Sequence, residues 1–220
     1  MHEGIKIRVE EWALDGEPFR LAAVAVGAAD WERELRGEAR EKVGRYVDGQ
    51  ARARAGASEW LKGVWLPGEL GMAAEFELGA NGKPLLKGAA AEWGFNLTHA
   101  GEWAVAALVR GKDVGVDLET MDRRADVEGI ARKVFSESER ELAAAGGREA
   151  FFALWSRKEA LMKALGCGWA DGKVQRRTRL NLEARQLEPA TGASVWWRRV
   201  EGGRYALAVA LAERRLVVSS

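Results

Sequence analysis

"KDVGVDLETM", residues 112–121, places two acidic side chains, Asp117 and Glu119, inside an otherwise apolar run. The valines and Leu118 predict a β-strand. Because side chains in a strand alternate between its two faces, Asp117 and Glu119 share one face. At about 7 Å and an effective dielectric near 20, the two charges would repel by roughly 2 kcal/mol. A half-buried strand with this repulsion requires an explanation from elsewhere in the chain.

The composition is that of a soluble globular protein. The chain has 220 residues, of which 47% are hydrophobic and 30% charged, enough for one domain with a good core or two small ones. The formal net charge of +1 gives no global field that would favour nucleic acid or a membrane surface. We therefore expect neither as a partner.

Two further features favour a cytoplasmic protein. A single cysteine, Cys167, excludes an intramolecular disulfide and fits a reducing compartment. The apolar stretch 21–29 is too short to span a bilayer, and the acids that precede it make a poor signal peptide.

Hydrophobic periodicity predicts an α+β fold. The first half is expected to contain strands at 5–12 and 19–26, a mainly helical segment at 30–65, a short strand at 73–78 and a loop at 79–86. Two strands that resemble a hairpin follow, at 102–109 and 113–119. The rest is expected to contain helices at 136–147 and 148–166 and then four strands, at 178–184, 194–200, 204–211 and 214–220. The buried runs 21–26 and 206–211 resemble each other. This indicates two similar α+β halves, residues 1–110 and 111–220.

The helix expected at 148–166 carries an anomaly in its apolar stripe. At about 100° per residue, Lys158 falls among the large apolar side chains of one face; these are Phe151, Leu154, Trp155, Leu161, Met162 and Leu165. A buried ammonium without a partner is costly. Either the Lys158 stem extends to water, or its ammonium meets an anion.

Three carboxylates and their neighbouring lysines form the main candidate site. Glu159 lies at the shoulder of the stripe and can join Asp117 and Glu119 if this helix packs on their strand. Such a set suits Mg²⁺ bound together with a phosphorylated substrate. The pair Glu159–Lys163 also fits a simple surface contact between residues four apart.

Other polar residues could contact phosphate, although each has a structural explanation. His99 follows Thr98 in "FNLTHAGEW", where it is well placed to donate to phosphate, yet a lone histidine is more often structural. Lys83 lies in the turn "NGKP". Glu139 follows Ser136 by three residues, a capping-box signature at a helix start.

Together, several stretches in order resemble the 4′-phosphopantetheinyl transferases of the surfactin-synthetase-activating (Sfp-like) type. They are "NGKPLL", "FNLTHAGEW", "VGVDLE", "FSESE" and "FFALWSRKEALMKALG", across about residues 81–170. The chain length resembles that of the two-halved monomeric type. The resemblance implies a pseudo-dimer of two α+β halves with the active site in the cleft between them, and a second half that carries most of the metal and catalytic residues.

The implied activity is that of a holo-[acyl-carrier-protein] synthase type of transferase. It moves phosphopantetheine from coenzyme A to a serine of an apo acyl or peptidyl carrier protein and releases adenosine 3′,5′-bisphosphate. Mg²⁺, with Mn²⁺ as a substitute, would be the metal. The sequence does not distinguish fatty-acid, polyketide and peptide-synthetase carriers.

The resemblance also implies residue roles. Asp117, Glu119 and Glu159 would hold the metal on the pyrophosphate. Lys158, Lys163 and His99 would contact phosphate oxygens. Thr98 and Lys83 would contact the nucleotide end of coenzyme A, and Arg52 and Arg54 would contact its 3′-phosphate. The lysines would stabilise the leaving oxygen. Glu139 matches the proposed general base, with Glu159 as the alternative. The family's S-H-S is Thr98-His99-Ala100 here, so one hydroxyl is lost.

Two other functions compete with this one. A Mg²⁺-dependent phosphohydrolase or nuclease also clusters acids and lysines, but the common nuclease pattern places a lysine where Met121 stands. A non-catalytic relative would bind coenzyme A or a carrier without turnover, and the intact acids and lysines argue against it.

Overall fold

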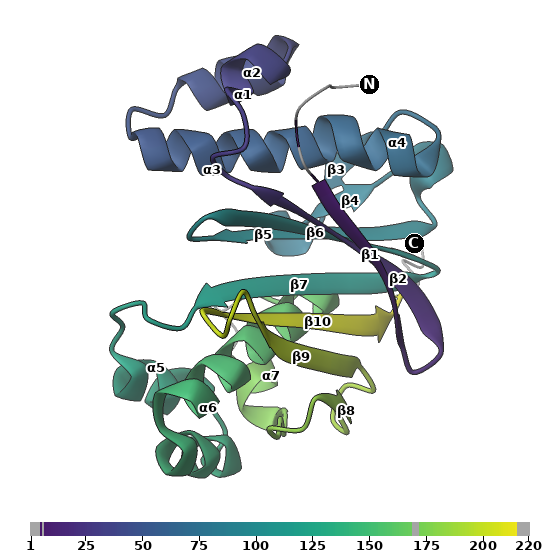
Figure 1. The fold of residues 1–220 in the computed structure, drawn as a ribbon. Coiled ribbons are helices and arrows are strands. Elements are labelled where there is room, and N and C mark those ends of the chain that lie inside the picture. Colours follow the sequence, from purple (N-terminus) through teal and green to yellow (C-terminus); the bar gives the residue numbers. More distant parts are fainter. Residues whose placement is uncertain (1–4, 6, 169–171, 215–220) are drawn as a thin grey trace.

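The computed structural model describes residue 5, residues 7–168 and residues 172–214, and the fold is built on two antiparallel four-stranded sheets (Figure 1). The first sheet has the order β1 (Ile7–Leu14), β2 (Glu17–Ala25), β6 (Trp103–Arg110) and β5 (Trp93–Ala100). The second has the order β7 (Lys112–Thr120), β10 (Tyr205–Glu213), β9 (Ser194–Val200) and β8 (Arg185–Leu187). β3 (Phe76–Leu78) and β4 (Pro84–Leu86) form a separate pair.

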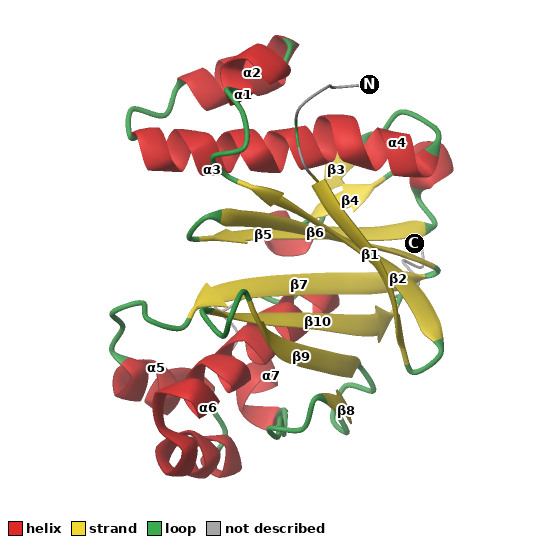
Figure 2. Cartoon of the chain, in the orientation of Figure 1, coloured by secondary structure: helices red, strands yellow, loops and turns green. Residues whose placement is uncertain are grey.

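Helices cover the outer faces of both sheets (Figure 2). On the first sheet lie α1 (Trp31–Glu34), α2 (Gly37–Gly44), α3 (Gly49–Trp60), the π-helical turn η1 (Leu61–Trp65) and α4 (Leu66–Leu70). The second carries α5 (Val127–Val134), α6 (Glu137–Leu165) and α7 (Gly172–Arg177). Two short 3₁₀ turns, η2 (Ala80–Gly82) and η3 (Gly88–Ala90), precede β5. In the described residues, no helix is both long enough and apolar enough to cross a bilayer.

Three buried clusters hold the layers together. One joins the first sheet to its helices and includes Trp60 and Leu61, and a second joins α6 to the second sheet. The third lies between the sheets, where Val105 from β6 packs with Val116 from β7 and Leu207 from β10. The α+β class is therefore confirmed. The equivalence of the halves as a pseudo-dimer, and the division at residue 110, stay predictions.

The expected hairpin of 102–109 with 113–119 is wrong. β6 pairs with β2 and β5, whereas β7 pairs with β10. The chain changes sheets at Gly111, which has a positive φ of 78°. Both strands are buried along most of their length because each is covered by a helix layer and by the other sheet, and such runs do not identify their neighbours.

The tail differs from the expectation in two places. Residues 178–184 are irregular, and the strand lies instead at β8, 185–187. The last expected strand, 214–220, falls almost entirely outside the described residues. The loop expected at 79–86 contains η2 and the short strand β4.

α6 confirms the two helices expected at 136–166, joined end to end. Ser136 and Glu139 form the predicted capping box, and Gly166 ends the helix with a left-handed φ of 64°. Between the two parts, Gly147 interrupts the helical backbone at φ 61° and ψ −147°.

Gly115 lets α6 lie directly on β7. A Cβ atom there would lie 2.0 Å from the carbonyl oxygen of Ala160 and 2.5 Å from the backbone nitrogen of Ala164. Only glycine permits this approach. It brings the last turns of α6 against the strand that carries Asp117 and Glu119.

Candidate functional site

Asp117 is a buried carboxylate with one oxygen occupied and one without a partner. Its exposed fraction is 5%. Lys163 Nζ donates to Oδ1 at 2.7 Å, whereas Oδ2 is buried and makes no hydrogen bond within the described part of the chain. Burial raises the pKa of Asp117 above its ordinary value, against the opposing effects of Lys163, Thr98 and Arg123. A buried carboxylate oxygen without a donor is costly, and a bound cation would offset that cost.

Glu119 lies on the same face of β7 and is held from two sides. The indole nitrogen of Trp155 donates to Oε1 at 2.7 Å, and Arg123 lies 3.1 Å from Oε2. Burial raises the pKa of Glu119, and the negative charge of Asp117 raises it further. The repulsion inferred from the sequence is therefore present in the fold.

Lys163 reaches this face from α6. Besides Asp117, its Nζ contacts the backbone oxygen of Val116 at 3.0 Å. The close packing at Gly115 places the Lys163 Cβ beside the strand. The helix thus packs on the acidic strand, the condition under which the sequence grouped its residues with Asp117 and Glu119, and the contact of Lys163 with a phosphate stays a prediction.

The expected set of three acids is not assembled as such. Glu159 is half-buried on α6, and no group of three or more His, Cys, Asp or Glu side chains suited to a metal occurs within residues 5, 7–168 and 172–214. Mg²⁺ sites, however, commonly use one or two carboxylates plus substrate phosphates. The unpartnered Oδ2 of Asp117 and the neighbouring Glu119 fit a metal of that kind.

The roles predicted for Lys158 and Glu139 need correction. Both side chains have an exposed fraction of 0% and form a buried ion pair. Lys158 also donates to the backbone oxygens of Val134 and Gln175, at 3.1 Å and 2.7 Å. Glu139 accepts from the backbone nitrogens of Ser136 and Leu180, at 2.7 Å and 3.0 Å. In this structure neither can contact a phosphate or a carrier serine, and the anion that Lys158 meets is Glu139.

A basic cavity of about 330 Å³ lies beside β5, between that strand and the helices α2 and α3. Its polar lining includes Lys42, Arg54, Ser58, Lys62 and His99. Glu59 pairs with both lysines, at 2.8 Å and 2.6 Å. One acid therefore faces three permanent cations, and the cavity favours an anionic ligand.

His99 lines this cavity and lies close enough to Lys163 to be influenced by its charge. Burial lowers its pKa, and the positive charges of Arg54 and Lys163 lower it further. A neutral imidazole still has one N–H to donate. Thr98, the residue before it, is buried and lies close enough to Asp117 to favour its charged form. β5 thus brings Thr98 and His99 to the same region as Asp117 and Lys163.

Arg52 and Lys83 lie outside the lining of this cavity. Arg52 is held by Glu32 at 3.0 Å and by the backbone oxygen of Tyr46 at 2.9 Å. Lys83 Nζ donates to the backbone oxygen of Ala164, at the C-terminal end of α6. Contacts of Lys83 with a nucleotide stay a prediction.

Sequence reasoning missed several residues of the site. Trp155 was assigned to the apolar stripe, although its indole N–H reaches Glu119. Arg123 follows Glu119 by four residues, but the turn that brings it back was not recognised. Lys42 and Lys62 precede the stretches at residues 81–170 that carry the family resemblance, and they flank the arginines of α3 in the sequence.

The chain is similar to known 4′-phosphopantetheinyl transferases. The family described as the 4′-phosphopantetheinyl transferase superfamily matches residues 113–210. The 4′-phosphopantetheinyl transferase HetI of Nostoc sp. is 32% identical over 138 residues, 59% of this chain and 58% of the relative. AcpT of Salmonella typhimurium is 35% identical over 114 residues, 50% and 59% of the two chains. The 4′-phosphopantetheinyl transferase psf-1 of Bacillus pumilus is 39% identical over 101 residues, which are 44% of this chain and 42% of the relative.

The chain thus spans between about two fifths and three fifths of the length of these relatives. The matched part begins with the strand of Asp117 and Glu119 and includes all of α6. On the family match and these relatives, residues 113–210 are similar to the 4′-phosphopantetheinyl transferase superfamily.

Proposed function

We propose that the protein is a 4′-phosphopantetheinyl transferase that uses coenzyme A and modifies a serine of an apo acyl or peptidyl carrier protein. The observation that carries this proposal is the pair Asp117 and Glu119, buried on one strand face with a carboxylate oxygen left without a donor, beside a basic cavity. A pyrophosphate with its metal needs such carboxylates, and a nucleotide phosphate needs the cations.

Different residues would bind different parts of coenzyme A. Arg54 and His99 would receive phosphate oxygens at the cavity, and Lys163 would contact the pyrophosphate. Mg²⁺ held by Asp117, Glu119 and pyrophosphate oxygens would neutralise charge on the phosphoryl group. Trp155 and Arg123 hydrogen-bond to the Glu119 carboxylate and would hold it in position for this role. Such transfers depend chiefly on positioning and charge neutralisation.

In the reaction, the serine oxygen forms a bond to the phosphorus that carries pantetheine, and the P–O bond of the pyrophosphate breaks. Adenosine 3′,5′-bisphosphate leaves with the bonding electrons, which Lys163 would stabilise. The serine proton passes to a base. With Glu139 buried, Glu159 is the carboxylate of the predicted set that we propose for this step.

The test is an intact-mass assay over a panel of apo acyl and peptidyl carriers with coenzyme A and Mg²⁺. A mass increase of one phosphopantetheinyl group on at least one carrier supports the proposal. If coenzyme A binds but no carrier gains mass, the chain is a binding relative without turnover. The Sfp-like subtype, a monomeric state and a cytoplasmic location remain predictions of the sequence.

A further inference from the structure

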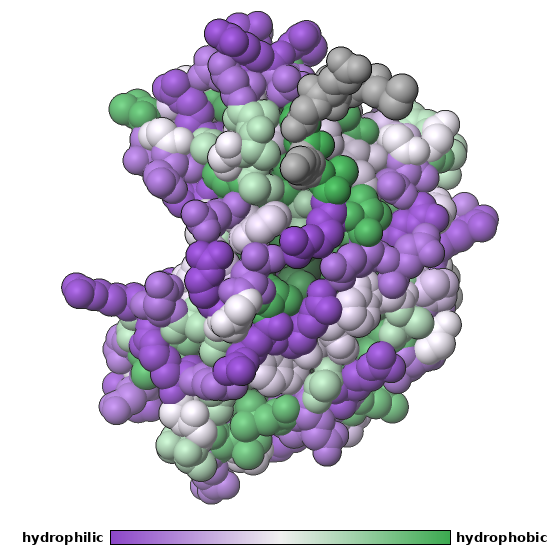
Figure 3. Space-filling model, in the orientation of Figure 1, coloured by the Kyte–Doolittle hydropathy of each residue, from purple (hydrophilic) through white to green (hydrophobic). Residues whose placement is uncertain are grey.

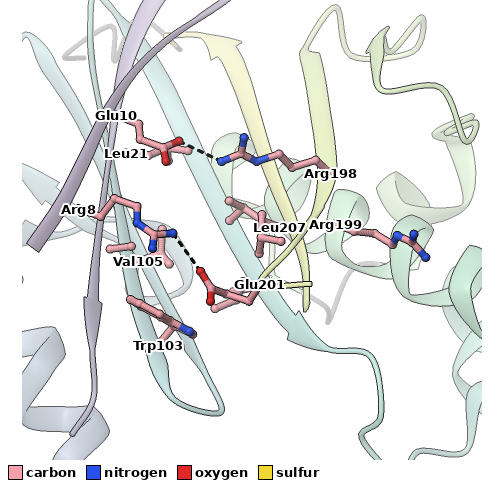
Figure 4. Close-up of a pocket in the computed structure, with 12 residues that line it drawn as sticks. Arg8, Glu10, Leu21, Trp103, Val105, Arg198, Arg199, Glu201 and Leu207 are labelled. Atoms are coloured by element: carbon pink, nitrogen blue, oxygen red, sulfur yellow. Dashed lines mark hydrogen bonds and ion pairs between the residues drawn. The ribbon is translucent and has the colours of Figure 1, made fainter. Parts of the chain in front are cut away.

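A second cavity lies on the opposite side of the β7 strand from the carboxylates. It has a volume of about 260 Å³ and opens between the two sheets, where β1 approaches β9 (Figure 4). Leu118, which lies between Asp117 and Glu119 in the sequence, lines it. Because neighbouring residues of a strand face opposite ways, an occupant here would not share the carboxylate face.

The inner surface of this cavity is apolar. Leu21 and Val105 contribute from the first sheet, Leu118 and Leu207 from the second, and Trp103 forms one wall. All but Trp103 are buried members of the cluster between the sheets. The cavity is therefore a gap in that cluster, where apolar atoms lack the dense packing of a protein interior. On this face, Figure 3 shows hydrophobic residues in a hollow bordered by hydrophilic ones.

The rim is charged and joins the two halves of the chain. Arg8 pairs with Glu201 and Glu10 with Arg198, each at 2.9 Å (Figure 4). Arg198 also lies over the rings of Trp12 and Trp196, at 4.4 Å and 5.4 Å. Its Nε is buried and has no hydrogen-bond partner among the described residues. Both glutamates have partners, whereas this donor has none, so the rim has capacity for one more acceptor.

We propose that this cavity binds a small organic acid with an unbranched aliphatic body, of the medium-chain carboxylate class. Its chain would fill the apolar gap, and its carboxylate would lie at the rim against Arg198. The volume lies just below the usual range for small-molecule sites, about 300–1,000 Å³, which favours a ligand of this size over a larger lipid. Arg199 turns away to Glu149, so two arginines and two glutamates balance at the rim, and the Nε–H of Arg198 that lacks an acceptor is what favours a carboxylate.

Isothermal titration of the full chain with sodium octanoate, below its micelle concentration, tests the proposal. Hexanoate should bind more weakly by roughly 15-fold, since each buried methylene contributes about fourfold in affinity. 1-Octanol should also bind more weakly than octanoate. Saturating coenzyme A with Mg²⁺ should leave the octanoate affinity unchanged. Absence of binding, or loss of binding with coenzyme A, would overturn the proposal, the latter because octanoate would then occupy the substrate site.

Two variants locate the ligand. Ala23→Leu extends a side chain into the cavity and should weaken octanoate at least about tenfold. Ala13→Leu makes the same change at an exposed position of the same sheet and should leave the affinity unchanged. Equal affinities in these two variants would refute the location. If Ala23→Leu fails to fold, Arg198→Gln decides the question, because it should weaken octanoate binding about tenfold. Arg199→Gln is its control and should leave the affinity for octanoate unchanged, because the Arg199 side chain turns away to Glu149.

Discussion

Lys163 on α6 and Asp117 on β7 form an ion pair of 2.7 Å that occupies one carboxylate oxygen and leaves the other buried without a donor. The pair joins a helix and a strand more than forty residues apart in sequence. It offsets part of the repulsion between Asp117 and Glu119 and leaves room for a second cation. Stability and function are therefore opposed at this strand.

Asp117→Asn should separate these two effects. Burial raises the pKa of Asp117 above its ordinary value of 3.8, so ionisation of this carboxyl destabilises the folded state. The loss of stability is absent below pH 3.8 and grows as the pH rises through the raised pKa. Without metal, the variant should be as stable as the wild type or more stable at neutral pH, with a flatter pH dependence in denaturant unfolding. Its transfer rate should fall about 100-fold or more, because even the outer partners of a metal contribute about 10–100-fold. A clear loss of stability with normal turnover would contradict this account.

Glu139→Gln should primarily destabilise the fold. It leaves Lys158 charged and fully buried, which costs about 3–5 kcal/mol. Urea unfolding measures the loss, and Glu137→Gln, an exposed acid in the same first turn, is the matched control. Turnover per folded molecule should stay near that of the wild type. A stable Glu139→Gln protein without activity would restore Glu139 as the general base.

Arg54 and Arg52 offer a matched pair for the basic cavity. Arg54 lines the cavity, whereas Arg52 is bound to Glu32 and to the Tyr46 backbone. Arg54→Gln should weaken coenzyme A about 10–100-fold, the loss of one charged hydrogen bond of about 1.5–3 kcal/mol. Arg52→Gln should leave affinity unchanged. Titration with dephospho-coenzyme A shows whether Arg54 contacts the 3′-phosphate, since that ligand should then lose little affinity in the variant. Equal effects of the two substitutions would refute this assignment.

Gly115→Ala should separate α6 from β7. The added Cβ would meet the Ala160 carbonyl oxygen at 2.0 Å, and overpacking of this kind costs about 3 kcal/mol. Gly63→Ala, where a Cβ would meet nothing within 4 Å, should be close to neutral. Thermal unfolding compares the two variants. A stable Gly115→Ala protein would show that α6 can move away from the strand without cost.

The sequence predicted the local features that depend on neighbouring residues. The capping box of Ser136, the helix end at Gly166 and the shared face of Asp117 and Glu119 all follow from short-range spacing. It did not predict which strands pair, because β6 and β7 are buried on both faces and lack the simple alternation of polar and apolar residues that specifies register. The sequence also did not identify the partner of Lys158. The periodicity of α6 left two possibilities, a stem that extends to water or an ammonium that meets an anion, and the structure shows that the anion is the capping acid Glu139, nineteen residues earlier.

The most direct test of the central claim measures two products in one reaction. Apo carrier, coenzyme A and Mg²⁺ are incubated with wild-type protein or Asp117→Asn, and the carrier mass and released adenosine 3′,5′-bisphosphate are quantified together. We predict equal amounts of modified carrier and released nucleotide, dependence on Mg²⁺, and loss of both products in the variant. Nucleotide release without carrier modification, or full turnover by Asp117→Asn, would contradict the assignment of this site.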